Sequence, residues 1–223
     1  MKPILILLLS AAFLPSLARA DVTFIQLAKS SQAGGNAKEA TIKTEIKGGM
    51  ARVDIGPAAS ILLNLDTADT VSLIHEKKIA VKISGEMAKN IQQQQAMQAG
   101  SSPIPDQPLT PTGKTETISG FPCEEYQGVA KGKKISIWVT KGQPDAEQAL
   151  TRLVKMVGDS DPLGALIKKE SLPGFPVRST VTDASGRTTT TTVTSLKSDP
   201  LPDADFDIPS DYMQKAISTL PSR

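Results

Sequence analysis

The chain has 223 residues, with 25 basic and 23 acidic side chains, and its residues are 39% hydrophobic but only 4% aromatic. This length is enough for one domain with a core of its own, and the scarcity of aromatic residues means that Ile, Leu, Val and Met must fill that core. The single cysteine, Cys123, excludes an intramolecular disulfide, and we interpret it as a small buried hydrophobic side chain.

The N-terminus has the pattern of a secretory signal peptide. Lys2 is followed by an apolar stretch over residues 4–14 and by the small-residue motif Ala18-Arg19-Ala20. We predict cleavage after Ala20, because such a stretch is too short to cross a hydrocarbon layer about 30 Å thick. The mature protein is therefore expected in the bacterial periplasm or outside the cell, with no integral membrane segment.

Charge makes some partners improbable for the mature chain. Loss of Lys2 and Arg19 from the 25 basic residues leaves 23, which equals the number of acidic residues. A neutral chain gives no electrostatic reason to expect nucleic acid or an anionic membrane as a partner.

The first half of the mature chain reads as an antiparallel meander. A first strand is predicted over 22–28, and Gly48-Gly49 fits a two-residue hairpin turn with positive φ. Because parallel strands need longer crossovers, the short spacing favours up-and-down pairing. The further strands are predicted at 41–46, 50–55, 60–65, 70–75 and 79–84.

Two segments of different character follow. Residues 86–99 predict a helix that is polar on most sides, so it should pack lightly or lie over an opening. Residues 100–113 contain four prolines, and we interpret them as an exposed connector that is neither helix nor central strand.

The stretch 118–141 predicts a hairpin with apolar residues on both faces. Ile135, Ile137 and Val139 alternate on one face, and Trp138 falls on the other. A sheet that is apolar on both sides needs a cover over its second face, which is either a helix or a ligand.

The second half contains the most strongly amphipathic helix of the chain, at 145–157, followed by a short helical piece at 162–169. Strands are predicted at 177–182 and 187–196. Residues 199–212 are expected to be extended and held to the body by Phe206, Ile208 and Tyr212, with a C-terminal tail over 213–223.

Four stretches carry a family resemblance: ISGFPCEEY at 118–126, IWV at 137–139, GFPVR at 174–178 and DFDIPSDY at 205–212. They resemble the secreted bacterial family DUF4412, which is similar to the LolA-like and LolB-like lipoprotein carrier and receptor folds. The resemblance implies a single α+β domain over 21–212. Its strongly curved, incompletely closed antiparallel sheet would form a half-barrel with helices over the concave face. The family has no assigned reaction, so no functional residues are carried over.

Candidate chemistry is sparse. His75 is the single histidine, and no other ligands for a zinc site lie near it in the sequence. Glu124 and Glu125 are adjacent on a strand and point to opposite faces, so they cannot share a substrate. The aspartates of 203–211 lack the glycine and terminal glutamate of a calcium loop. We predict no catalytic residue, no metal and no cofactor, and therefore no enzyme.

The leading hypothesis is a protein that binds a lipid or another apolar ligand between sheet and helices. The expected lining is Ile135, Ile137, Trp138, Leu150, Leu153 and Met156. The alternative is an envelope interaction or structural module with a filled core, which contacts a protein partner through its glutamine-rich segment, its connector or a sheet edge. An enzyme is a third interpretation, and it requires a cluster of polar residues in a cleft.

Overall fold

The computed structural model describes residues 21–32, 37–98, 106–157, 164, 166–167 and 172–217. Within these ranges, twelve strands form one sheet, accompanied by the helices α1 and α2, by helical residues at 164, 166 and 167, and by a 3-10 turn. In chain order the elements are β1 (Val22–Ser31), β2 (Lys38–Lys47), β3 (Met50–Ile55), β4 (Ala59–Asn64), β5 (Thr70–Ile74), β6 (Ile79–Ile83), α1 (Gly85–Gln98), β7 (Gln107–Ile118), β8 (Phe121–Ala130), β9 (Lys133–Thr140), α2 (Pro144–Val157), β10 (Phe175–Thr182), β11 (Thr188–Lys197), η2 (Asp203–Phe206) and β12 (Met213–Ile217).

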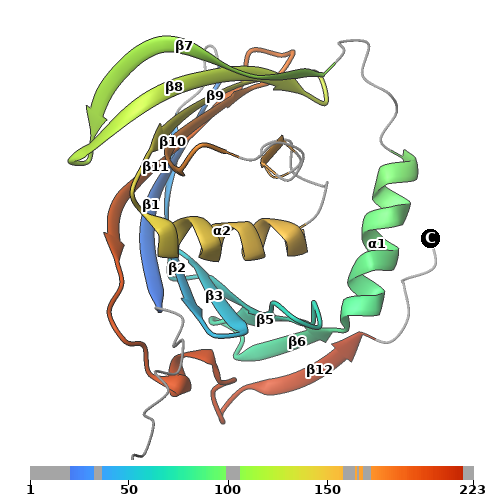
Figure 1. The fold of residues 1–223 in the computed structure, drawn as a ribbon. Helices are drawn as coiled ribbons and strands as arrows, with labels where there is room; N and C mark the ends of the chain where they lie inside the picture. Colours follow the sequence, from blue (N-terminus) through green and yellow to red (C-terminus); the bar gives the residue numbers. More distant parts are fainter. Residues whose placement is uncertain are drawn as a thin grey trace, which may run out of the picture.

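The strand order is β12-β6-β5-β4-β3-β2-β1-β11-β10-β9-β8-β7. The sheet consists of two meanders, β1 to β6 and β7 to β11, which meet where β1 pairs antiparallel with β11. Within each meander, consecutive strands are adjacent in the sheet. Every pairing is antiparallel except that of β12 with β6. Because β12 and β7 are the two edges, the sheet is curved but not closed, as Figure 1 shows. The predicted fold class is confirmed.

Strand register separates a concave from a convex face. Helix α2 lies on the concave side (Figure 1), where its Ala146 and Ala149 are buried with Val22 and Phe24 of β1. This packing is expected, because the apolar side chains of α2 recur at helical spacing and form one stripe. The predicted helix at 145–157 is confirmed.

The convex face of β4 to β6 is covered by the C-terminal segment. Ile208 and Tyr212 of this segment pack against the buried Leu62 and Leu73, and Phe206 is only 8% exposed. The prediction that these three side chains hold 199–212 to the body is confirmed, but the segment is not extended throughout, since Asp203–Phe206 form a 3-10 turn.

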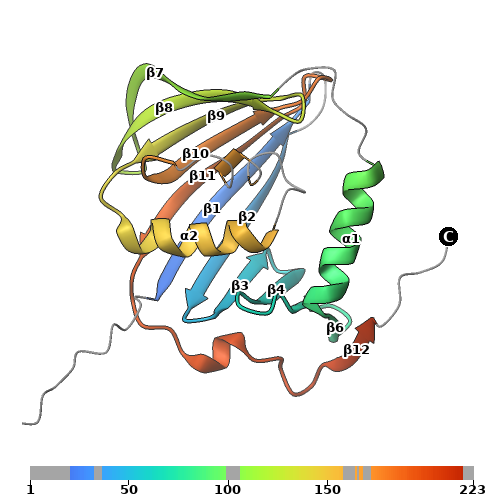
Figure 2. The same cartoon turned by 45° about the vertical axis from the view of Figure 1, so that its right-hand side comes forward.

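Helix α1 has a different place. Figures 1 and 2 show it along the open side of the curved sheet, between the edges formed by β6 with β12 and by β7. Its N-terminus is fixed where the Gly85 backbone N–H donates to Asp69 Oδ1 at 2.8 Å. The prediction that the polar helix lies over an opening fits this placement.

Two sequence boundaries need correction. Residues 107–113 of the proline-rich connector belong to β7, since proline is compatible with an edge strand, which need not donate every ladder hydrogen bond. Residues 213–217 of the expected tail form β12, which pairs parallel with β6. Of the helical piece at 162–169, residues 164, 166 and 167 are helical and the others lie outside the described residues, as do 1–20 and 218–223.

Candidate functional site

The six residues expected to line a cavity fall into two neighbouring apolar clusters. Leu150, Leu153 and Met156 of α2 pack, together with Trp138, against the cluster built around Phe24. The other two residues, Ile135 and Ile137, are buried in a second cluster, which Leu166 joins. The structure therefore brings four of the six together.

A cavity of about 390 Å³ lies beside α2. This size is within the usual range for small-molecule sites. Of the six predicted residues, Leu150 lines it. Its apolar walls are Leu150, Val154, Ile167 and Leu172, and its polar rim includes Glu147, Thr151 and Lys155.

A larger apolar surface lies on the concave face of β2 to β6. Ile42 of β2 pairs with Ile55 of β3, Ile55 with Ala59 of β4, and Ala59 with Ile74 of β5. Ile74 pairs in turn with Ile79 of β6, and Ile79 pairs with Met213 of β12. Directly paired residues point to the same face of a sheet. We call this set the aliphatic row: Ile42, Ile55, Ala59, Ile74, Ile79 and Met213.

The aliphatic row is poorly covered. Ile55, Ile74 and Met213 are 41%, 37% and 62% exposed, and no member of the row belongs to a buried apolar cluster of the described chain. Ile217, 38% exposed, faces the same side because it pairs with Ile83 of β6. No other large hydrophobic side chain of the described residues is exposed, and these four lie on one face.

The concave face thus has a closed and an open end. Near the turn at Gly48, Arg152 of α2 donates to the Gly48 carbonyl and to Asp66 Oδ1, so α2 covers that end. The aliphatic row lies at the opposite ends of the same strands, where residues 55–59 and 74–79 form turns. A ligand on the row would therefore enter from the end that α2 leaves free.

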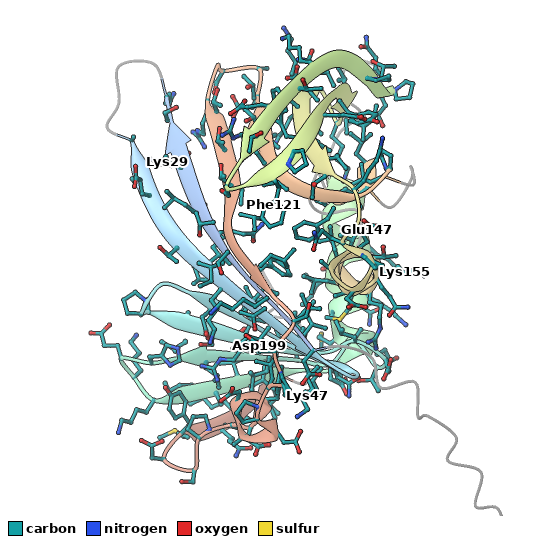
Figure 3. The ribbon with its side chains drawn as sticks, turned by 60° about the vertical axis from the view of Figure 1, so that its left-hand side comes forward. Lys29, Lys47, Phe121, Glu147, Lys155 and Asp199 are labelled. Atoms are coloured by element: carbon teal, nitrogen blue, oxygen red, sulfur yellow. The ribbon has the colours of Figure 1, made fainter. Side chains whose placement is uncertain are left out.

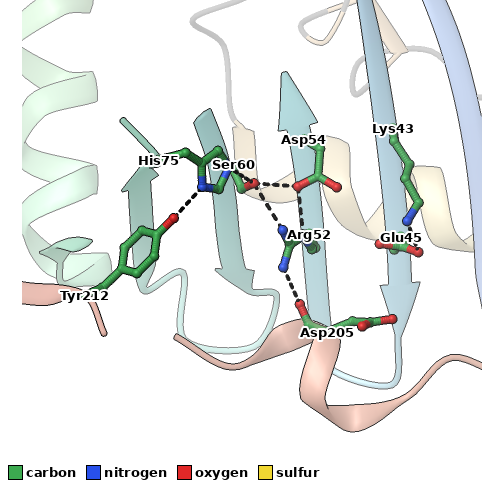
Figure 4. Close-up of polar contacts among 8 residues, drawn as sticks. All are labelled: Lys43, Glu45, Arg52, Asp54, Ser60, His75, Asp205 and Tyr212. Carbon is green, nitrogen blue, oxygen red and sulfur yellow. Dashed lines mark hydrogen bonds and ion pairs between the residues drawn. The ribbon is translucent and has the colours of Figure 1, made fainter. Parts of the chain in front are cut away.

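A polar cluster occupies the convex face behind the row (Figure 4). Ser60 Oγ donates to Asp54 Oδ1 at 2.5 Å and accepts from Arg52 at 3.2 Å. His75 Nε2 lies 2.8 Å from the same Ser60 Oγ, and His75 Nδ1 lies 2.6 Å from the Tyr212 hydroxyl. Because the Ser60 proton goes to Asp54, His75 donates to Ser60 from Nε2, and its Nδ1 shares a hydrogen bond with the Tyr212 hydroxyl.

This cluster fastens the C-terminal segment. Ser60 is fully buried and its hydroxyl is engaged on every side, so it offers no accessible nucleophile despite the adjacent histidine. Arg52 also donates to the Asp205 carbonyl at 2.8 Å, and Lys78 pairs with Asp211 at 2.7 Å. The sequence interpretation of His75 as a packed imidazole near a turn agrees with this arrangement.

Glu124 and Glu125 point to opposite faces, as predicted. Glu124 pairs with Lys141, whereas Glu125 is buried and accepts hydrogen bonds from Gln127 and Ser136 through Oε1 and from Thr112 through Oε2. Burial alone would raise the pKa of Glu125, but these donors outweigh it and lower the pKa to about 2.

Cys123 is only 3% exposed, and burial raises the pKa of its thiol, in agreement with its interpretation as a buried side chain. No group of three His, Cys, Asp or Glu residues in the described chain could hold a metal ion. None of the helices described is long and apolar enough to cross a membrane.

Comparisons with known proteins give a family and several structural likenesses. Residues 24–212 match the family model DUF4412, a domain of unknown function. A search of curated proteins finds no match. Among solved structures, PNGF-II is 12% identical with a TM-score of 0.42, and the match covers 88% of this chain but 31% of that one.

Two further solved structures are matched over most of their length. A LolA superfamily protein from Nitrosomonas europaea is 13% identical with a TM-score of 0.38, and the match covers 85% of this chain and 90% of that one. A DUF1329 family protein from Desulfovibrio piger is 14% identical with a TM-score of 0.35, with 86% and 91% covered.

Proposed function

The chain belongs to the DUF4412 family, and we propose that it is a non-catalytic periplasmic or secreted protein that binds a lipid or another ligand with an acyl chain. The signal-peptide pattern of residues 1–20 supports the location. The ligand would lie on the concave face of the sheet. The observation that carries this proposal is the aliphatic row, since exposed apolar surface gathered on one concave face is typical of a binding site.

Binding would be driven by removing apolar surface from water. Each CH₂ group buried contributes about 0.8 kcal/mol, so an acyl chain laid across the row gains affinity with its length. The cavity beside α2, whose walls include Leu150 and Val154, would be a separate apolar site on the concave side. Leu153 and Met156 would support this site from the cluster beneath α2, and Ile135 and Ile137 from the neighbouring cluster. Trp138 pairs with Arg178 and Glu125, so it faces the opposite side of the sheet from Ile137.

The test is the binding of N-phenyl-1-naphthylamine, an apolar probe that fluoresces when it leaves water. Wild-type protein should bind the probe, and fatty acids should displace it. Ile74→Glu places a charge in the middle of the aliphatic row and should weaken probe binding at least tenfold. Gln214→Glu adds the same charge on the convex face of β12, because Gln214 pairs with the buried, convex-facing Ala80, and it should bind as the wild type does.

Circular dichroism must show that both variants are folded. A wild-type protein that leaves the probe dark, or a folded Ile74→Glu variant that binds it normally, would contradict the proposal. A protein partner is the other occupant the aliphatic row could accept. In that case the probe would not bind, and sedimentation in an envelope extract would show a complex that Ile74→Glu disrupts.

A further inference from the structure

Basic residues that are far apart in the sequence lie close together in the turns at one end of the sheet. The six consecutive strands β2-β1-β11-β10-β9-β8 are joined at this end by the turns β1–β2, β10–β11 and β8–β9. Register places them together, since Ser31 pairs with Thr188 and Thr182 with Lys134. We call the basic residues here the basic rim: Lys29, Lys38, Lys131, Lys133, Lys134 and Arg187.

The basic rim has an excess of positive charge. Its acidic neighbours are Glu39, which pairs with Lys29, Asp106, which accepts from the Lys131 backbone, and Asp183, which caps its own turn. Six bases against three acids leave three positive charges. Because residues 21–223 are neutral in total, the remainder of the mature chain carries three negative charges.

The three lysines of the β8–β9 turn have free ammonium groups. Lys131, Lys133 and Lys134 form no ion pair within the described ranges, and Lys131 and Lys134 are exposed. The opposite end of the sheet differs. Figure 3 shows Lys29 far from Lys47 and Asp199, and there Lys47 is paired with Asp203.

The basic rim and the aliphatic row lie at the same end of the sheet. Lys38 begins β2, and Ile42 of the row lies four residues further along the same strand. Figure 2 shows the ends of β8 to β11 gathered with the end of β1. The turn at 75–78, beside the row, has no excess of charge, since it carries Glu76, Lys77 and Lys78, and Lys78 is paired with Asp211.

We propose that the basic rim docks the protein on an anionic membrane surface, with the open end of the concave face toward the bilayer. The biological reason for such docking rests on the proposed function, since a ligand with an acyl chain is taken from a bilayer or delivered to one. The docking itself rests on charge. Lysines near an anionic leaflet each strengthen binding severalfold, and this attraction falls off within a Debye length of about 8–10 Å.

The experiment measures co-sedimentation of the protein lacking residues 1–20 with vesicles. One set is pure phosphatidylcholine, and the other contains 30% phosphatidylglycerol. We expect wild-type protein to bind the anionic vesicles at least tenfold more tightly, and 0.5 M salt to abolish the difference. The triple variant K131Q/K133Q/K134Q should bind the anionic vesicles about a hundredfold more weakly.

The matched control removes three other exposed lysines, in K82Q/K89Q/K197Q, and should bind nearly as the wild type does. Equal weakening of the two triple variants would overturn the proposal, because net charge would then be the cause. Absence of any preference for anionic vesicles would also overturn it.

Probe binding separates this proposal from the proposed function. The rim variant should still bind N-phenyl-1-naphthylamine, and Ile74→Glu should lose the probe while still sedimenting with anionic vesicles. If the probe never binds but the vesicle preference holds, the docking stands and the ligand proposal fails.

Discussion

Replacing Glu125 by glutamine is expected to destabilise the protein at neutral pH and to have little effect in acid. Glu125 is 6% exposed, and its carboxylate accepts hydrogen bonds from Gln127, Ser136 and Thr112. Its pKa falls from an ordinary 4.5 to about 2 in the fold. This difference corresponds to about 3 kcal/mol of folding free energy at pH 7.

The pH dependence follows from the direction of that change. A carboxyl whose pKa is lower in the folded state stabilises the fold above its unfolded pKa. This stabilisation is lost as the pH falls from about 4.5 toward 2. Glutamine is a mimic of the neutral acid, so the difference in unfolding free energy between wild type and Glu125→Gln should shrink over this range.

Urea unfolding, followed by the fluorescence of Trp138, measures that difference at pH 7 and at pH 2.5. The control is Glu124→Gln, because the Glu124 side chain is 47% exposed and its ion pair with Lys141 contributes about 0–1 kcal/mol. A difference for Glu125→Gln that is the same at both pH values would refute the reasoning.

Three further variants or reactions test other parts of the structure. Tyr212→Phe removes the hydrogen bond to His75, so β12 amides should exchange several times faster while those of β1 do not. Gly174→Ala should lower the free energy of unfolding by about 2 kcal/mol or more, because an added Cβ would lie 2.2 Å from the Thr140 carbonyl oxygen. Unchanged stability in urea would contradict this prediction. Cys123 should react with a thiol reagent in urea and not in the native state, where fast labelling would show that the thiol is accessible.

Local patterns were sufficient for most elements of this fold. The turn at Gly48-Gly49 follows from the residues themselves, since Gly48 has a φ of +52°, which glycine adopts readily. The amphipathic stripe of α2 likewise defines one helix with one buried face. These signals are local in the chain, so the sequence displays them directly.

Long-range pairing was not predictable in the same way. Nothing in β1 indicates that it pairs with β11, which lies more than 150 residues later, and the exposed residues of β12 do not reveal that it joins β6. The prolines of β7 suggested a connector because proline is rare in central strands, but at an edge it is tolerated.

The same limit applies to the sites. The aliphatic row combines residues from six strands, and each of these strands contributes only one member. The basic rim could not be predicted from the total charge, which is neutral for residues 21–223. Its lysines and arginine come together only because the fold places three turns at one end of the sheet. The cluster of Arg52, Ser60, His75 and Tyr212 likewise spans distant segments. The stripe of α2 predicts a buried face, and Leu150 on this helix lies in the wall of the cavity beside it.

The most direct test of the central claim is native mass spectrometry of the protein purified from an envelope extract without detergent, followed by organic extraction of the bound material. The account predicts a bound species of lipid mass on the wild type and on Gln214→Glu, and its loss from folded Ile74→Glu. A protein that is free of ligand as isolated, and that stays free of ligand after incubation with lipid vesicles, would contradict the account.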